Sequence, residues 1–242
     1  MANISGNPIV GGIDLYSSSA NPIAEVGSLI FGDSGKAFRY VLAGETLVVG
    51  NVLQSSVVDT QFDDMAVAAN VAAGQNQIVL TNGTTAVTAG QFVGGTVEFS
   101  VTPHLGGEYT IVGHSTATNG SSWTITLDRP LRTAITSAAT KATVRRSPWS
   151  GSIQLPTTQT GTPVGVAIYA IPSGEYGWVQ TKGVAAVLSD NSTFAVGSAL
   201  SNSVATAGAV GVFVAGTARS LIGHAMRAAA SGKTIPVQLC LD

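Results

Sequence analysis

The sequence predicts an all-β protein: a Gly-rich β-barrel or sandwich with an inserted second small β-domain and an extended N-terminal arm. Among 242 residues there are 29 glycines, and Ser, Thr and Ala are also abundant, a composition that favours many short strands joined by tight turns. Hydrophobic residues make up 45% of the chain, enough for a core, whereas charged residues make up 10%, against roughly 25% in typical soluble domains. We therefore expect part of the surface to be buried against other copies or a partner.

Residues 1–36 are predicted to form the extended N-terminal arm. Turn-forming pairs such as Asn7-Pro8 and Asn21-Pro22 interrupt every apolar stretch before it reaches the length of a strand. An extended segment offers unpaired backbone groups that can add to the sheet of a neighbour.

Residues 37–62 and 164–242 are predicted to form the main β-domain. A hairpin is expected over 37–54, with its turn at Ala43-Gly44-Glu45. Residues 221–230 have near-helical apolar spacing, but a strand followed by a turn remains an alternative there. The other strands expected in this domain cover 164–171, 177–188, 194–200, 209–214 and 234–239.

Residues 63–147 are predicted to form the inserted β-domain. Turn pairs, among them Gly94-Gly95, Gly106-Gly107 and Asn119-Gly120, separate the apolar runs. Residues 148–163, rich in Pro, Ser, Thr and Gly and without periodicity, are predicted to be a linker. The strands expected in the insert cover 77–81, 91–101, 108–114, 123–127 and 141–145.

Charge and hydropathy argue against two classes of partner. The net charge is −2 and the arginines do not cluster beyond Arg145-Arg146, so we expect no nucleic-acid binding. No segment reaches the ~18 consecutive apolar residues of a membrane span, and Met1–Val10 does not have the pattern of a signal peptide. We therefore expect a soluble protein made in the cytoplasm of its host, without a membrane partner.

The residues that carry chemistry do not form a recognisable active site. His104, His114 and His224 lack the close spacing of metal ligands, and the sole cysteine, Cys240, has no second thiol to pair with. No Gly-x-Ser-x-Gly motif is present, and the 13 acidic residues are scattered. We expect no enzyme activity, catalytic residue, cofactor or metal, and we expect His104 and His114 to be exposed beside the Gly106-Gly107 turn.

Aromatic residues are the candidates for contact with another molecule. Trp and Tyr are either core anchors or interface anchors, and the sequence leaves both interpretations open. The possible interface residues are Phe38, Tyr40, Trp149, Tyr176 and Trp178.

Two segments resemble tailed-bacteriophage capsid decoration (cement) proteins. Residues 36–54 are similar to the opening of such proteins, and Gly165-Val166-Ala167 with Tyr176–Gly183 resembles a paired strand-and-turn signature. The resemblance covers about half of the chain, and residues 63–147 depart from the shortest members.

The resemblance implies a phage virion structural protein on the capsid exterior. Its partners would be the phage major capsid protein and further copies of itself, with a trimer favoured, and residues 1–30 would reach across to neighbours. The alternative is a tail or fibre module that binds a host-surface glycan through Trp123, Tyr109 or Trp149.

Overall fold

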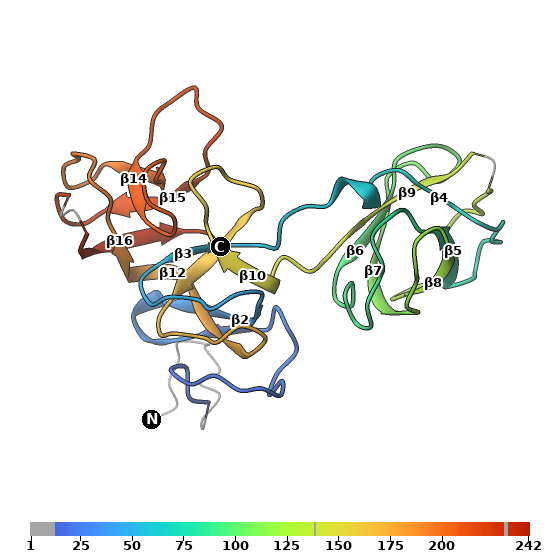
Figure 1. Ribbon diagram of the computed structural model, residues 1–242, viewed down its shortest axis with the longest axis horizontal. Coiled ribbons are helices and arrows are strands. Elements are labelled where there is room, and N and C mark those ends of the chain that lie inside the picture. Colours follow the sequence, from blue (N-terminus) through green and yellow to red (C-terminus); the bar gives the residue numbers. More distant parts are fainter. Residues whose placement is uncertain (1–12, 138, 230–231) are drawn as a thin grey trace. The chain divides into compact units, whose positions relative to one another are not determined.

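The computed structural model describes residues 13–137, 139–229 and 232–242, and over these residues the chain is all-β. Strands are joined by turns, with short 3-10 helices at η1 (Asp33–Gly35) and η2 (Thr60–Phe62). The chain divides into two compact units: unit 1 combines the chain up to Val57 with Pro148–Asp242, and unit 2 is Val58–Ser147 (Figure 1). Unit 2 thus interrupts unit 1 in the sequence.

The strands of unit 1 are hydrogen-bonded in the order β1-β2-β10-β3-β11-β12-β16-β15-β13-β14. Because β2 pairs with β12 as well as with β10, the run from β2 to β12 closes into a barrel. The remaining strands continue the sheet as a half-barrel. The bounds are β1 Leu29–Phe31, β2 Ala37–Ala43, β3 Val52–Gln54, β10 Ser150–Gln154, β11 Pro163–Ala167, β12 Tyr176–Leu188, β13 Ala199–Asn202, β14 Val210–Val212, β15 Leu221–Ala225 and β16 Thr234–Cys240.

Strand β12 belongs to both parts of unit 1. Its first half pairs with β2, from Tyr176 opposite Leu42 to Lys182 opposite Ala37, and its second half pairs with β16, from Lys182 opposite Cys240 to Leu188 opposite Thr234. The exchange of partners occurs at Lys182-Gly183, where Gly183 has φ +81°, a conformation that costs other residues energy. A Cβ at Gly183 would lie 3.1 Å from Lys36 Cα.

Strands β2 and β12 are buried on both faces where they pair. Val41 and Val179 belong to the core inside the barrel, whereas Phe38, Tyr40 and Trp178 form a second cluster on its outer face. A fully buried strand reads as a continuous apolar run rather than as an alternation. This explains why residues 177–188 were recognisable as a strand.

The outer cluster is covered by the residues that precede β1. Ile13, Leu15 and Ala24 pack against it, as does Ile30 of β1. The backbone N–H of Ile23 donates a hydrogen bond to the Tyr40 hydroxyl over 3.1 Å. The extended N-terminal arm predicted over 1–36 does not stand apart from the domain at residues 13–36, because apolar residues between the turns pack on the chain's own barrel. Residues 1–12 lie outside the described residues.

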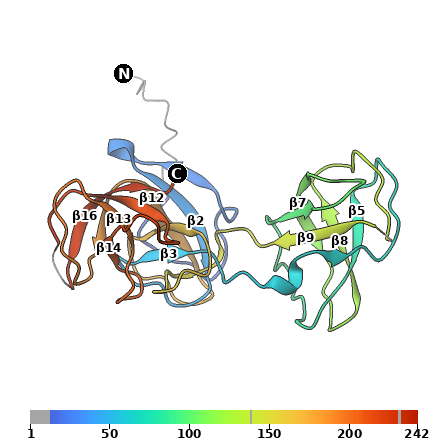
Figure 2. The same ribbon diagram turned by 90° about the horizontal axis from the view of Figure 1, so that it is seen from above.

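Unit 2 is a small barrel of its own. Its strands follow the order β4-β9-β6-β7-β8-β5, and a β-bridge between Val67 and Leu80 links the two ends of this order, so the strands curve around a shared core (Figure 2). Apolar side chains alternate inward along most strands, as expected when one face is solvated. The bounds are β4 Met65–Ala66, β5 Gln77–Thr81, β6 Thr96–Phe99, β7 Gly107–His114, β8 Ser122–Leu127 and β9 Lys141–Arg145.

Two of the connections predicted for unit 1 are wrong. Strands β2 and β3 do not form a hairpin, because β10 lies between them, parallel to β2 and antiparallel to β3. Residues 148–163 are accordingly not a simple linker. Strand β10 is built from Ser, Gly, Ile and Gln, with Ser152 fully buried, so backbone pairing forms it without an apolar period.

Two further predictions concern the C-terminal region. Residues 221–225 form β15, so the strand alternative holds there and the helix does not form. The strand predicted over 194–200 begins only at Ala199, while Phe194 enters the core from a loop. In both segments tertiary pairing, rather than local spacing, decides the conformation.

The change Gly183→Ala should destabilise unit 1 more than Gly174→Ala does. Gly174 has nearly the same φ, +80°, but nothing lies within 4 Å of its would-be Cβ. The control therefore carries only the left-handed backbone cost of about 1–2 kcal/mol, whereas Gly183→Ala adds a clash with the backbone of Gly35 and Lys36. Urea unfolding followed on the NMR amide signals of β12 and β16 measures both, and equal losses would contradict the assigned close approach.

Candidate functional site

The predicted interface residues divide into buried and accessible ones. Phe38, Tyr40 and Trp178 are 4%, 1% and 1% exposed, with the Tyr40 ring stacked near Tyr176 and tilted against Trp178. Burial raises the pKa of the Tyr40 hydroxyl above its usual value. These three side chains are core anchors of unit 1, so their prediction as contacts with another molecule is corrected.

Trp149 and Tyr176 are half-buried and are held by their own unit. The Arg39 guanidinium lies 4.4 Å from the centroid of the Trp149 ring and forms an ion pair with Asp242. The backbone of Tyr176 exchanges two hydrogen bonds with Ser19. Both residues keep an accessible part, but they do not form a joint aromatic platform.

The residues predicted for glycan stacking are also not exposed together. Trp123 is 1% exposed in the core of unit 2, against Phe92 and His114. Tyr109 is 2% exposed, and the Arg129 guanidinium covers its ring at 4.8 Å from the centroid. Neither ring has a free face for stacking, because both rings are packed in the core of unit 2.

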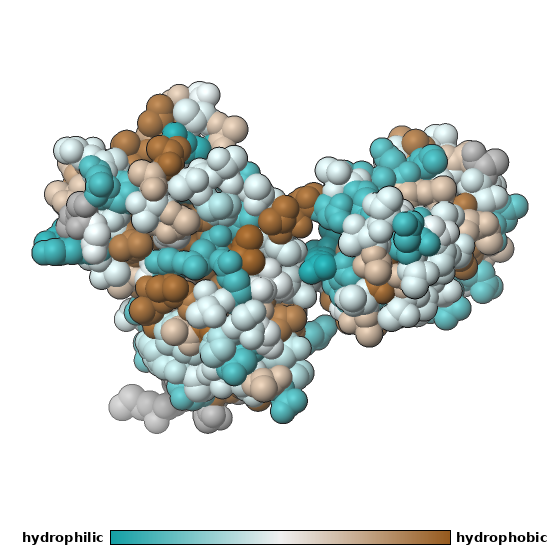
Figure 3. Space-filling model, in the orientation of Figure 1, coloured by the Kyte–Doolittle hydropathy of each residue, from teal (hydrophilic) through white to brown (hydrophobic). Residues whose placement is uncertain are grey.

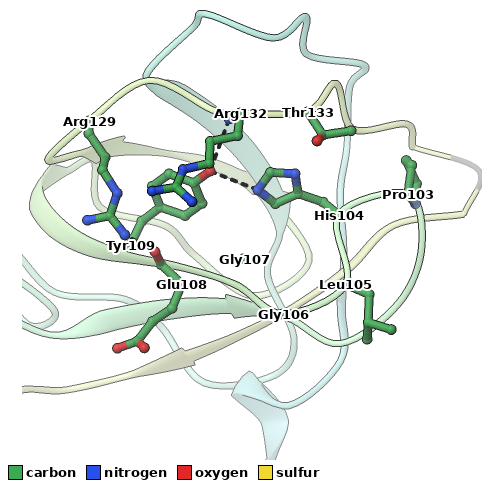
Figure 4. A pocket seen from close by; sticks show the side chains of 10 residues that line it. All are labelled: Pro103, His104, Leu105, Gly106, Gly107, Glu108, Tyr109, Arg129, Arg132 and Thr133. Carbon is green, nitrogen blue, oxygen red and sulfur yellow. Dashed lines mark hydrogen bonds between the residues drawn. The ribbon is translucent and has the colours of Figure 1, made fainter.

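A polar pocket of about 310 Å³ lies on unit 2, beside the buried Tyr109 (Figure 4). The turn between β6 and β7 forms one part of its wall, and the segment that follows β8 forms the other. Gly106, with φ +76°, allows the tight turn. The lining residues are Pro103, His104, Leu105, Gly106, Gly107, Glu108, Tyr109, Arg129, Arg132 and Thr133.

His104 is buried in the wall of this pocket, which corrects the expectation that it is exposed. Its Nε2 lies 2.8 Å from the Tyr109 hydroxyl, which accepts a hydrogen bond from the backbone N–H of Arg132 over 3.2 Å. The His104 ring and the Tyr109 hydroxyl are thus joined by a hydrogen bond in the wall of the pocket. Burial, followed by the charge of Arg132, lowers the pKa of His104 below its usual value and keeps the ring neutral.

His104 Nδ1 is a buried atom that has no hydrogen-bond partner among the described residues. A buried polar group without a partner costs about 1–3 kcal/mol. Edge contacts from Phe99, at 4.9 Å between ring centroids, fix the imidazole in place. The wall of the pocket therefore contains an imidazole that is buried and held in place.

Two arginines give the pocket a positive side. Arg129 is held by an ion pair to Asp128 at 2.6 Å and donates to the Glu108 carbonyl. The guanidinium of Arg132 is exposed and forms no hydrogen bond or ion pair with any described residue. In Figure 4 the Glu108 carboxylate points away from it. One cation without a counter-ion among the described residues thus belongs to the lining of the pocket.

One face of the molecule is only weakly polar. On the face shown in Figure 3, most residues are pale, neither strongly hydrophilic nor strongly hydrophobic, and the brown and teal groups are small. On this face, residues of neutral hydropathy thus largely take the place of charged residues. It does not produce one continuous apolar face in this view.

Searches for a metal centre and for a membrane helix give negative results within the described ranges. No group of three or more His, Cys, Asp or Glu residues is placed to hold a metal ion in this part of the chain. Nor does the described part contain a helix long and apolar enough to cross a membrane. Comparison with protein-family models, with curated proteins and with solved structures gives no match.

Sequence reasoning missed the pocket because its parts come from segments distant in the chain. The sequence predicted a turn at Gly106-Gly107 followed by a strand over 108–114, and Arg129 and Arg132 were not singled out. The available signal was a histidine and a tyrosine five residues apart around Gly106-Gly107. That spacing places both side chains at one end of the barrel when the hairpin closes.

The change Arg132→Gln should raise the pKa of His104, because the guanidinium is one cause of its depression. Between the folded pKa and the unfolded value of about 6.5, the unfolded chain binds more protons. His104 therefore contributes stability that is present above about pH 6.5 and is lost as the pH falls through the folded pKa. An NMR titration of the His104 ring measures the shift, with Lys141→Gln on β9 as the control of equal charge. An unchanged pKa in Arg132→Gln would contradict the assignment.

Proposed function

We propose that the protein is a non-enzymatic structural protein of a phage virion, a capsid decoration protein that associates with itself and with the major capsid protein shell. The resemblance of residues 36–54 and 176–183 to such proteins motivates the proposal. The observation that carries it is the free edge of the unit 1 sheet at β1.

Strand β1 pairs on one side with β2, Ile30 opposite Phe38, and ends the strand order on the other side. Its sequence, Leu-Ile-Phe, contains no charge, and the side chains of Leu29 and Phe31 are each 39% exposed. Natural proteins usually protect such an edge with charge, proline or a covering segment. Within the described residues no further strand pairs with this edge, and an apolar edge is suited to pairing with another chain.

The surface beside this edge is apolar as well. A pocket of about 330 Å³ is lined by Ile13, Leu15, Ile30, Phe31 and Phe38 together with more polar neighbours. Tyr16 and Ile23, 64% and 61% exposed, add to the apolar character of the same N-terminal region. Burial of this region in an assembly would remove its contact with water at roughly 25 cal/mol per Å². The assembly we propose is a small closed oligomer, with a trimer favoured by the resemblance, on the outside of the capsid.

The alternative, a tail or fibre module that binds a host glycan, loses two of its three predicted contact residues because Trp123 and Tyr109 are buried, whereas Trp149 keeps an accessible part. What favours it now is the polar pocket at His104 and Arg132. That pocket lies on unit 2, whereas the contact proposed for shell binding is the edge of unit 1. The two functions would therefore use different surfaces.

The proposal is tested by the mass of the purified chain in solution and by its binding to capsid shells of the encoding phage that lack accessory proteins. We expect light scattering to give a closed oligomer and the shells to bind the chain to saturation. A monomer that does not sediment with the shells would overturn the proposal.

The double change Leu29→Lys and Phe31→Lys should weaken this association by about tenfold or more, because it places two charges on the proposed contact. The control is Val112→Lys on β7, an exposed apolar position of unit 2, 53% exposed. It should leave association unchanged. Equal effects of the edge and control variants would show that β1 is not the contact.

A further inference from the structure

His114, at the C-terminal end of β7 in unit 2, is held by two backbone groups whose hydrogen-bonding roles are fixed. The backbone N–H of Phe92 donates a hydrogen bond to Nε2 of the ring over 3.1 Å, and Nδ1 lies 2.9 Å from the Ser115 carbonyl oxygen. A backbone N–H can only donate and a carbonyl can only accept, so Nε2 presents its lone pair and Nδ1 carries the proton. The two partners therefore determine both the neutral state of the imidazole and its tautomer.

This hydrogen bond attaches a core residue of the segment before β6. Phe92 is 2% exposed and belongs to the core of unit 2. No other hydrogen bond joins residues 88–93 to β7 within the described part of the chain. The next attachment is made by the backbone alone, where Gly94 N–H donates to the Ile111 carbonyl over 2.8 Å. Residues 88–93 therefore depend on the His114 ring for their hydrogen bond to β7.

Protonation of His114 would break this attachment. An imidazolium carries a proton on both nitrogens, so Nε2–H would face the Phe92 N–H and neither group could accept. The His114 ring is half-buried, with its centroid 5.5 Å from that of Trp123, so its accessible part can exchange protons with water. An imidazole in water is half protonated at about pH 6.5. Mild acid therefore removes the acceptor on which the Phe92 amide depends.

The charged groups around this ring do not replace the lost hydrogen bond. The Arg146 guanidinium lies 5.9 Å from the centroid of the Phe92 ring, and the charge of Asp59 acts on that guanidinium. Strand β8, against which the His114 ring packs, contains no charged residue, and Glu108 lies at the other end of β7. Among the described residues no carboxylate forms an ion pair with His114. An imidazolium would thus gain no counter-ion in exchange for the amide.

We propose that His114 is an acid-sensitive latch in unit 2, which holds residues 88–93 on β7 when the ring is neutral and releases them when it is protonated. The backbone hydrogen bond from Gly94 to Ile111 does not titrate, so it keeps the end of the segment in place. The release is therefore local and leaves the barrel closed. The latch is independent of the contact proposed for shell binding, which lies on unit 1.

Amide hydrogen exchange of the full chain, followed by NMR, tests the latch through the protection factor of the Phe92 N–H. If the proton is gained only when the segment is open, opening becomes about 30-fold more favourable between about pH 7.5 and about pH 5. We expect the Phe92 protection factor to fall by about tenfold or more over this range. The Val71 N–H, which donates to the Ile135 carbonyl over 3.0 Å in the same unit, is the internal control and should change by less than about twofold. Equal falls at both amides, or no fall at Phe92, would overturn the proposal.

Matched variants assign the pH response to one histidine. In His114→Gln the side-chain Oε1 takes the place of Nε2 as acceptor but does not titrate, so the Phe92 protection factor should vary by less than about twofold over the same pH range. His224→Gln changes an exposed histidine of unit 1 and should keep the full response at Phe92. A response that persists in His114→Gln, or that disappears in His224→Gln, would overturn the role of His114.

A second measurement on the unchanged protein does not depend on the folding of any variant. The NMR scalar coupling between the Phe92 backbone nitrogen and His114 Nε2 reports the hydrogen bond directly. We expect the coupling at about pH 7.5 and its loss at about pH 5, because the acceptor lone pair is then protonated. Absence of the coupling at both values would contradict the assigned acceptor, and its persistence at about pH 5 would contradict the release.

Discussion

The continuity of β12 is the constraint on which unit 1 depends. This strand has 13 residues. Its first half forms part of the wall of the closed barrel, and its second half is the first strand of the half-barrel. The exchange requires a local bend in a strand that remains hydrogen-bonded on both sides, and Gly183 provides it. Since β2 and β11 pair with one half and β16 with the other, the positions of most other strands follow from this one. The two cores share a backbone element, so motion of one is felt by the other.

The chain carries few charged residues, and its two units cover their apolar side chains in different ways. Unit 1 uses its own N-terminal residues to cover the aromatic cluster of Phe38, Tyr40 and Trp178, and it leaves an apolar edge at β1. Unit 2 joins the ends of its strand order through the Val67–Leu80 bridge, and it carries a polar pocket beside Tyr109. A rigid barrel that carries functional side chains on its loops is a common arrangement. Here the barrel buries the Tyr109 ring and leaves its hydroxyl to organise His104 and Arg132.

The sequence predicted the type of most elements better than their pairing. Strands with strict alternation or continuous apolar runs, such as 77–81 and 141–145, match β5 and β9 at both ends, because local burial determines them. Strand β10 was missed, because its Ser and Gly residues carry no apolar period and non-local partners hold it in the sheet. The covering role of residues 13–36 depends on packing against β2 and β12, which spacing does not encode. For the same reason His104 was expected to be exposed, whereas contacts with Phe99 and Tyr109 bury it.

The place of unit 2 in the chain has an architectural consequence. It connects β3 to β10, and these strands pair with each other antiparallel, Gln54 opposite Ile153 and Leu53 opposite Gln154. In topological terms the whole unit occupies the position of a hairpin loop. The cost in entropy of closing a loop grows only slowly with its length, and an insert with its own core brings its own stability. Such a site tolerates exchange of one insert for another without altering the way the unit 1 scaffold folds.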